Sequence, residues 1–274
     1  MSKELKIKLD NRSKTLRKYI VRALLSANRG HFGSSMSLVE ILRVLYDDII
    51  LFDNRNPKYE KRDRVILSKG HGCLALYSIL ADKNFFNKKE FDKYCSLNSI
   101  LGGHPESHKV PGVEASTGAL GHGLPIAVGI ALSLKLKKSK SKVYVIVGDG
   151  ELNEGSNWEA MMSAKKYKLS NLKIIVDYNK IQSYDFVKNV IDLEPLDHKF
   201  KSFGFDVSEV NGHNIKELRK NFLQFKKKNS KKSSVTICHT IKGKGFKMAE
   251  NNPVWHHKNS FSNEEIKLIE KSIN

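Results

Sequence analysis

Short apolar runs, rich in β-branched residues, recur along the chain and are separated by stretches with helical spacing. They lie at 64–68, 142–147, 172–179, 205–210 and 233–240. The runs are apolar nearly throughout instead of alternating with polar residues, as in strands that are buried on both faces of a parallel sheet. Strands that alternate with helices indicate a doubly wound α/β sheet with helices on both faces. We therefore expect a single α/β domain over residues 1–274.

Three segments have the spacing of helices. The first is 13–28, whose apolar stripe consists of Leu16, Ile20, Ala23, Leu24 and Ala27. Gly30 follows where a glycine often ends a helix, so we expect it to be the C-terminal cap. Residues 37–50 predict a second, apolar helix and residues 156–167 a third.

Composition narrows the class of protein. The formal net charge is +19, but the basic residues are scattered, and where they crowd at 135–142 and 226–232 no aromatic residue is interleaved, so we expect solvated faces and not a nucleic-acid groove. Cys73, Cys95 and Cys238 lie far apart and without metal-ligand spacing. No apolar run approaches the ~20 residues that span a bilayer, and the N-terminal residues are polar. The expectation is a cytoplasmic enzyme that binds neither nucleic acid nor membrane.

A candidate metal site lies at the ends of two predicted strands. Run 142–147 leads into Gly148-Asp149-Gly150, and Asn179 ends the run at 172–179. Ligands of doubly wound sheets bind beyond the carboxyl ends of the strands. Gly-Asp-Gly alone is more often a tight turn, but Asp149 and Asn179 together suit Mg²⁺ or Ca²⁺ that also binds a diphosphate.

Three of the ten histidines lie in glycine-bounded loop contexts: His31 in Gly-His-Phe-Gly, His71 in Ser-Lys-Gly-His-Gly and His104 in Gly-His-Pro-Glu. Glycine lets the backbone bend and lets a ligand approach closely. Imidazoles titrate near neutral pH and suit a reaction that moves protons on and off hydroxyls and carbonyls.

These motifs together resemble a known family. The pattern GDGELNEGSNWEA followed by DYNKIQ is similar to the thiamine-diphosphate motif of transketolases. GHFGSSMS, RVILSKGH, STGALG, HTIKGKGF and ENNPVWH resemble the short N-terminal subunits of split transketolases. The resemblance covers residues 14–258. It implies a diphosphate-binding domain that binds thiamine diphosphate.

The resemblance implies a role for each matching residue. The side chains of Asp149 and Asn179 and the carbonyl of Ile181 would bind the metal. Gly150 would approach the diphosphate, while Gly118 and Leu120 would border the cofactor. Among the histidines, His71 would lie near the diphosphate and His104 near the terminal hydroxyl of the donor sugar. His31 and His256 would handle protons and hydrogen bonds around the donor hydroxyl and the acceptor aldehyde.

Two positions depart from the family pattern. The family usually has glutamine at the position of His122 and glycine at the position of His257, so both add an imidazole near the expected site mouth or subunit interface. The remaining histidines are expected to be structural or surface residues: His108, His198, His213 and His239.

The resemblance also implies a partner. In this family, the glutamate that activates the cofactor and most residues that bind the substrate's phosphate belong to a pyrimidine-binding domain. Residues 260–274 predict only one polar helix, so we expect the pyrimidine-binding and C-terminal domains on a separate chain, in an α2β2 heterotetramer. Glu154 would lie at the interface, in a proton-coupled link between active sites. The alternative for Glu154 is an ordinary exposed carboxylate at a helix start.

The implied activity is transfer of a two-carbon ketol unit from a ketose to an aldose, either of which can carry phosphate. Three alternatives stay open. These are the α subunit of a 2-oxoacid dehydrogenase, another thiamine-diphosphate enzyme such as a deoxyxylulose-phosphate synthase fragment, and a non-catalytic cofactor-binding module. Gly103-His104-Pro105-Glu106 and His31 favour a hydroxylated ketose donor.

Overall fold

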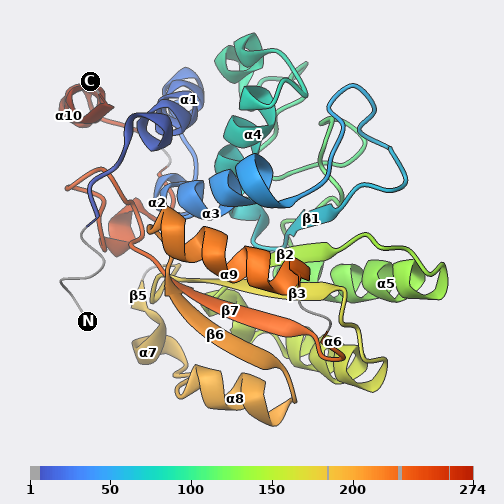
Figure 1. Cartoon of the computed structure of the whole chain (residues 1–274). Coiled ribbons are helices and arrows are strands. Elements are labelled where there is room, and N and C mark those ends of the chain that lie inside the picture. Colours follow the sequence, from blue (N-terminus) through green and yellow to red (C-terminus); the bar gives the residue numbers. More distant parts are fainter. Residues whose placement is uncertain (1–6, 184, 228–229, 259, 274) are drawn as a thin grey trace.

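A computed structural model describes residues 7–183, 185–227, 230–258 and 260–273. At its centre lies a five-stranded sheet with the order β1-β2-β3-β7-β6, in which every neighbouring pair is parallel (Figure 1). The strands are β1 Arg64–Leu67, β2 Val143–Gly148, β3 Leu172–Tyr178, β6 Asp206–Asn211 and β7 Ser234–His239. Each of the five apolar runs is therefore a strand, and the α/β prediction is confirmed. A two-stranded antiparallel sheet, β4 Ile181–Gln182 and β5 Asp185–Phe186, was not predicted.

Helices cover both faces of the sheet, and each face has its own apolar core. On one face lie α1 Asn11–Ala27, α2 Phe32–Met36, α3 Val39–Val44, α4 Cys73–Asp82 and α9 Ile215–Lys227. On the other lie α5 Gly123–Leu136, α6 Gly155–Lys166 and α8 Leu196–Ser202. Successive strand residues alternate between the two cores: Tyr144 and Ile146 join the first, whereas Val145 and Val147 join the second. This alternation explains why the central strands are apolar throughout.

The edge strand β6 differs from that expectation. Its residues are half-buried or exposed, whereas those of β1, at the other edge of the sheet, are all buried. The prediction that this run is buried on both faces was wrong. The sequence of an edge strand can still be rich in β-branched residues, since one face of β6 packs under α9.

Two helix predictions are corrected by the backbone. The cap of α1 is Asn28, which adopts the left-handed conformation with φ 52°. Gly30 is not the cap; it forms an antiparallel bridge with Lys258. The predicted helix 37–50 is divided into α3 and a π-helical turn, η1 Leu45–Ile49. The third prediction is confirmed as α6.

The remaining elements are short or peripheral. They are η2 Gly70–Gly72, η3 Lys88–Lys93, η4 Gly150–Asn153, α7 Val187–Val190, η5 Pro253–Trp255 and α10 Asn263–Ile273. In the described part of the chain, no helix is both long and apolar enough to cross a membrane.

Candidate active site

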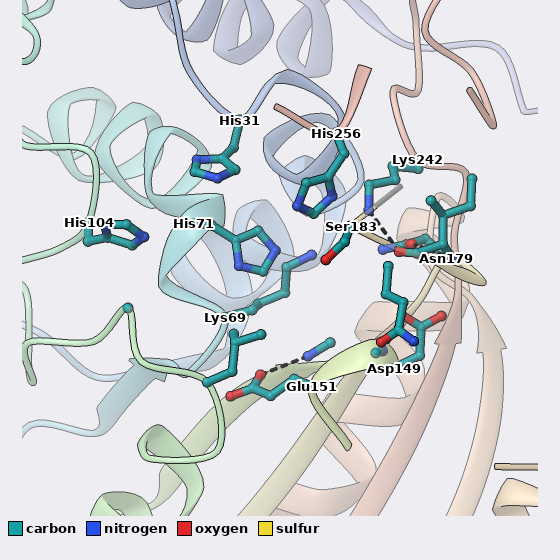
Figure 2. A pocket seen from close by; sticks show the side chains of 16 residues that line it. His31, Lys69, His71, His104, Asp149, Glu151, Asn179, Ser183, Lys242 and His256 are labelled. Atoms are coloured by element: carbon teal, nitrogen blue, oxygen red, sulfur yellow. Dashed lines mark hydrogen bonds between the residues drawn. The ribbon is translucent and has the colours of Figure 1, made fainter. Parts of the chain in front are cut away.

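A cavity of about 230 Å³ opens beyond the carboxyl ends of β1, β2 and β3. Figure 2 shows His31, His71, His104 and His256 on one side of it and Asp149 and Asn179 on the other, with Lys69 between. The other predicted residues in its wall are Gly118, Leu120, Gly150 and Ile181. Every site residue predicted from the sequence lines this cavity except Glu154.

The two predicted side-chain ligands come together because their strands are neighbours. Gly148 of β2 pairs with Asp177 of β3, so Asp149 and Asn179 both emerge at the same edge of the sheet. Asp149 accepts hydrogen bonds from the backbone N–H groups of Gly150 and Lys180, and Asn179 Oδ1 accepts one from Ile181 at 3.1 Å. Asp149 and Asn179 are both buried.

These residues fit a hard divalent cation. Burial, and then the neighbouring Asp177, raise the pKa of Asp149 to about 6, so a cation would favour the ionised carboxylate. The Ile181 carbonyl already accepts a hydrogen bond from the Lys242 ammonium at 2.7 Å. Among the described residues, no three His, Cys, Asp or Glu side chains are arranged to hold a metal ion. The donors here are instead a carboxylate, an amide and a carbonyl, which are all oxygen ligands that leave positions for phosphate oxygens.

The wall beside these ligands can approach a diphosphate closely. A Cβ on Gly150 would lie against Gln182 Cβ, at less than van der Waals separation. Gly118 has φ +153°, and a Cβ there would meet the His104 ring at 2.9 Å. A side chain at either position would displace its neighbours, so both glycines bring bare backbone to the cavity.

A buried ion pair supports the same wall. Lys69, which follows β1, donates to Asp177 Oδ2 at 2.5 Å. Ser37, Thr240 and Asn179 also donate to this carboxylate. Burial by itself raises the pKa of Asp177, but the Lys69 ammonium and these hydrogen bonds outweigh it and hold the pKa below its usual value. Asp177 therefore orients Asn179 as an ionised acceptor.

A second buried carboxylate, Glu151, joins the Gly-Asp-Gly turn to the neighbouring loops. It accepts hydrogen bonds from Ser68 Oγ and from the backbone N–H groups of Gly121 and Gly148. Burial raises the pKa of Glu151. This carboxylate holds the 118–121 loop against the end of β1, and so fixes the wall that Gly118 and Leu120 provide.

Four histidines from separate segments meet at the other end of the cavity. The ring centroid of His31 lies 5.4 Å from that of His71, 5.9 Å from His104 and 5.7 Å from His256. His71 and His256 are 5.4 Å apart. His256 Nδ1 is buried and, among the described residues, has no hydrogen-bond partner. The cluster therefore has a ring nitrogen that is available to hydrogen-bond a ligand.

The surroundings of these imidazoles favour their neutral form. Burial, followed by the nearby His257, lowers the pKa of His31 to about 3. Burial lowers the pKa values of His71, His104 and His256 as well, and the Lys69 or Lys242 ammonium lowers those of His71 and His256 further. A neutral imidazole has one N–H donor and one acceptor nitrogen, so it can both donate to and accept from a sugar hydroxyl.

Three predicted positions lie outside the cavity wall. Glu154 is exposed and is the N-cap residue of α6. His122 is exposed, and its ring nitrogen Nδ1 hydrogen-bonds the Leu120 carbonyl at 2.9 Å. His257 is also exposed, but its ring lies 4.5 Å from that of His31.

The four histidines expected to be structural or on the surface do not line the cavity. His213 is buried and pairs with Glu40 at 2.8 Å, and His239 pairs with Glu209. His108 and His198 are exposed beside Glu106 and Asp197, respectively. Each of these imidazoles has a carboxylate neighbour, unlike the cluster in the cavity.

Sequence reasoning missed several residues of the wall. Lys69, Glu151, Gln182, Ser183 and Lys242 all line the cavity. Lys69 and Lys242 lie in motifs that carry the family resemblance, but isolated lysines in a lysine-rich chain give no signal of burial. The one clue in the sequence that Lys69 and Glu151 line the site was their position close to a motif histidine or aspartate.

Comparison with known proteins agrees with this geometry. Residues 10–273 match the family described as "Transketolase, thiamine diphosphate binding domain". The chain is 44% identical to an apulose-4-phosphate transketolase subunit of Actinobacillus succinogenes, over 91% of this chain and 90% of that one. It is 36% identical to the 6-deoxy-6-sulfo-D-fructose transketolase subunit SqwG of a Clostridium species, over 93% and 92% of the two chains.

Solved transketolase structures are also similar to this chain. A transketolase variant from Pichia stipitis superposes with a TM-score of 0.89 at 30% identity, over 98% of this chain and 41% of that chain. The chain thus spans about two fifths of that longer transketolase but nearly the whole of the two subunit relatives. On these grounds the chain belongs to the transketolase family and corresponds to its thiamine-diphosphate-binding, N-terminal subunit.

Proposed function

We propose that this chain holds thiamine diphosphate through a bound Mg²⁺ ion and, with a partner subunit, transfers a two-carbon ketol unit from a ketose to an aldose. The observation that carries the proposal is a single cavity with two chemically different ends. Oxygen donors gather at one end, around Asp149 and Asn179, and neutral imidazoles gather at the other, around His31.

The oxygen-rich end is suited to the diphosphate and its metal. Asp149, Asn179 and the Ile181 carbonyl would bind Mg²⁺, and Ca²⁺ would suit the same oxygen ligands. Gly150 and Gly118 would let the diphosphate lie against the backbone, and Lys242 would place a positive charge beside it. Thiamine diphosphate, when bound, supplies a nucleophilic carbon and an electron sink for the transferred unit.

The imidazole end is suited to a polyhydroxylated substrate. His104 would hydrogen-bond the terminal hydroxyl of the ketol unit, and His71 would lie between substrate and diphosphate. His31 and His256 would accept and return the hydroxyl proton as the donor's carbon–carbon bond breaks and the acceptor's forms. Neutral imidazoles can do this because each has a free acceptor nitrogen.

The same hydroxyl partners favour a ketose over a 2-oxoacid. Pyruvate has no hydroxyl on its two-carbon unit, so His31 and His104 would be left without a substrate partner in a dehydrogenase. The names of the two relatives point the same way, because they specify transketolases of a phosphorylated and of a sulfonated sugar. A phosphorylated or sulfonated ketose is therefore the first donor to test.

The pyrimidine-binding domain and its activating glutamate would belong to a separate chain, in an α2β2 assembly. Relatives of similar length that are named as subunits of a transketolase support this arrangement. A surface suited to the partner lies over α5 and α6, which pack against each other. Ile126 and Met162 are exposed there, and a Cβ on Gly129 or Gly155 would meet none of the described atoms. Apolar side chains beside bare glycine backbone are typical of a helix-packing surface.

Glu154 would belong to this interface. It begins α6, beside Gly155, and lies close to Gly121 of the loop that borders the cavity. A carboxylate at that position could link the interface to the cofactor end of the site. Glu154 is exposed in the single chain, which supports contact with a partner and does not support a role inside the cavity.

The test is reconstitution. This chain and its partner are purified separately, and ketol transfer is measured for each alone and for the mixture, with thiamine diphosphate and Mg²⁺ present. We expect turnover only in the mixture, because neither chain alone has both the diphosphate site and the glutamate. The matched control is a mixture containing Asp149→Ala. Robust transfer by the isolated wild-type chain would show that the division of residues between subunits is wrong.

A further inference from the structure

The segment 255–258 is fixed beside His31 by the fold. Gly30 and Lys258 form two backbone hydrogen bonds, of 2.9 and 3.0 Å, in an isolated antiparallel bridge. Trp255 packs edge-on against Phe32, with ring centroids 5.2 Å apart. Lys258 lies over Trp255 and also forms an ion pair with Glu265 at 2.7 Å. His257, between these anchors, is therefore held at a definite place on the rim of the cavity.

The His257 ring lies next to the imidazole cluster of the cavity. Its centroid is 4.5 Å from that of His31, closer than the centroid of His71, His104 or His256. The contact recorded for its side chain is this ring contact, and in the described part of the chain no hydrogen bond or ion pair engages His257. Its exposure leaves both ring nitrogens available to a ligand that projects from the cavity.

The described cavity wall leaves room for an anion at this rim, because its carboxylates lie elsewhere. The carboxylates in the cavity wall are Asp149 and Glu151, and both accept hydrogen bonds from backbone N–H groups at the opposite end. His257 contributes to the lowered pKa values of both His31 and His104, so it lies within electrostatic reach of each. Imidazoles without a carboxylate partner can each donate an N–H hydrogen bond to a negatively charged group placed among them, and such bonds to an ionised acceptor are strong.

We propose that His257 is a specificity-determining residue that hydrogen-bonds a tetrahedral oxyanion on the sugar substrate. The reacting carbons of that substrate would lie between His31 and His104. The oxyanion can be a phosphate ester or a sulfonate, which offer the same arrangement of acceptor oxygens. This inference rests on the proposed ketol transfer and adds the residue of this chain that distinguishes charged sugars from neutral ones.

The experiment compares each charged donor with its uncharged parent sugar. The reconstituted complex is assayed with xylulose and xylulose 5-phosphate, and with fructose and 6-deoxy-6-sulfofructose, against one common aldose. We expect His257→Gly to lower kcat/KM for a charged donor on the order of tenfold to a hundredfold while leaving the neutral donor within about twofold. His257→Arg, which places N–H donors at the same position, should retain the preference. His198→Ala removes an exposed imidazole outside the cavity and should change neither value.

The outcomes separate the two hypotheses. Loss confined to the phosphate pair identifies a phosphate ester as the ligand, and loss confined to the sulfonate pair identifies a sulfonate. Equal losses for charged and neutral donors, or no loss for either charged donor, overturn the role of His257 while ketol transfer by the complex stands. A wild-type complex that binds cofactor but turns over no ketose would overturn the proposed function, and this inference with it.

Discussion

Arg17 donates two hydrogen bonds to the carboxylate of Glu40, of 2.6 and 3.0 Å, in the interior between α1 and α3. Both side chains are at most 2% exposed. Arg17 also donates to the carbonyls of Met36 and Lys244, and Glu40 hydrogen-bonds His213 at 2.8 Å. This buried network joins α1 and α3 to the segments that follow β6 and β7, and so supports the loop that contains Lys242.

Arg17→Met should destabilise the fold strongly. It leaves the Glu40 carboxylate buried with only His213 as a partner, which costs about 3–5 kcal/mol of unfolding free energy for a broken buried pair. Urea unfolding of the isolated chain measures the loss. Arg22→Met is the matched control, because Arg22 and Asp92 form an exposed pair that contributes little to stability. Similar losses in the two variants would contradict this role for the buried pair.

The same pair makes stability depend on acid pH. Burial by itself raises the pKa of Glu40, but Arg17 and His213 outweigh it and hold the pKa well below the usual value of 4.5. A depressed folded-state pKa contributes stability above the unfolded-state pKa and loses it as the pH falls through the folded value. We expect the unfolding free energy to fall more steeply below pH 4.5 in the wild type than in the double variant Arg17→Met/Glu40→Gln. If the unfolding free energies of the two proteins changed with pH in parallel, Glu40 would be excluded as a contributor to the acid dependence of stability.

Asp149→Ala and Asn179→Ala should each weaken cofactor and metal binding together. Each change removes an oxygen ligand of the same ion, and the metal holds the diphosphate. Calorimetry on the reconstituted complex should show losses on the order of tenfold or more for thiamine diphosphate. Asp92→Ala, which removes a surface carboxylate, serves as control. Unchanged cofactor affinity in both site variants would refute the ligand assignment.

His104→Ala should impair a hydroxylated ketose donor far more than it impairs cofactor binding. Loss of one hydrogen-bond partner costs about 1–3 kcal/mol, which corresponds to a fall in kcat/KM of roughly fivefold to 150-fold. Steady-state kinetics with a ketose donor, together with a cofactor titration, give both values. Efficient pyruvate decarboxylation by the wild-type complex, with His104 dispensable, would favour a 2-oxoacid dehydrogenase instead.

Ile126→Glu should weaken association with the partner subunit without unfolding this chain. Ile126 is 39% exposed on α5, so a charge there is solvated in the single chain and becomes desolvated only in an interface. We expect the dissociation constant to rise by about tenfold or more in analytical ultracentrifugation, while circular dichroism stays unchanged. Leu268→Glu, on the remote helix α10, should leave assembly intact. Equal effects of the two variants would argue against a partner surface over α5.

Residue order alone determined the central strands, α6 and the approximate extent of α1. Tyr144 and Val145 are both apolar because β2 is buried on both faces, and that local pattern needs no tertiary information. The sequence also predicted that Asp149 and Asn179 lie together, because parallel neighbours deliver their carboxyl ends to one edge. Family motifs extended the prediction to four histidines, which line one cavity in the structure, while their chemical roles stay predictions.

Only the tertiary structure decided which polar residues are buried and what they contact. Asn28 and Gly30 both favour left-handed or otherwise rare backbone conformations, so the sequence could not choose the cap; the bridge from Gly30 to Lys258, far along the chain, did. Lys69, Asp177 and Glu151 look like ordinary charged residues until strands and loops distant in sequence enclose them. Burial in a low-dielectric interior changes their hydrogen bonding and, for Asp177 and Glu151, the pKa of the carboxyl group. Such an environment is created by contacts that no local pattern encodes.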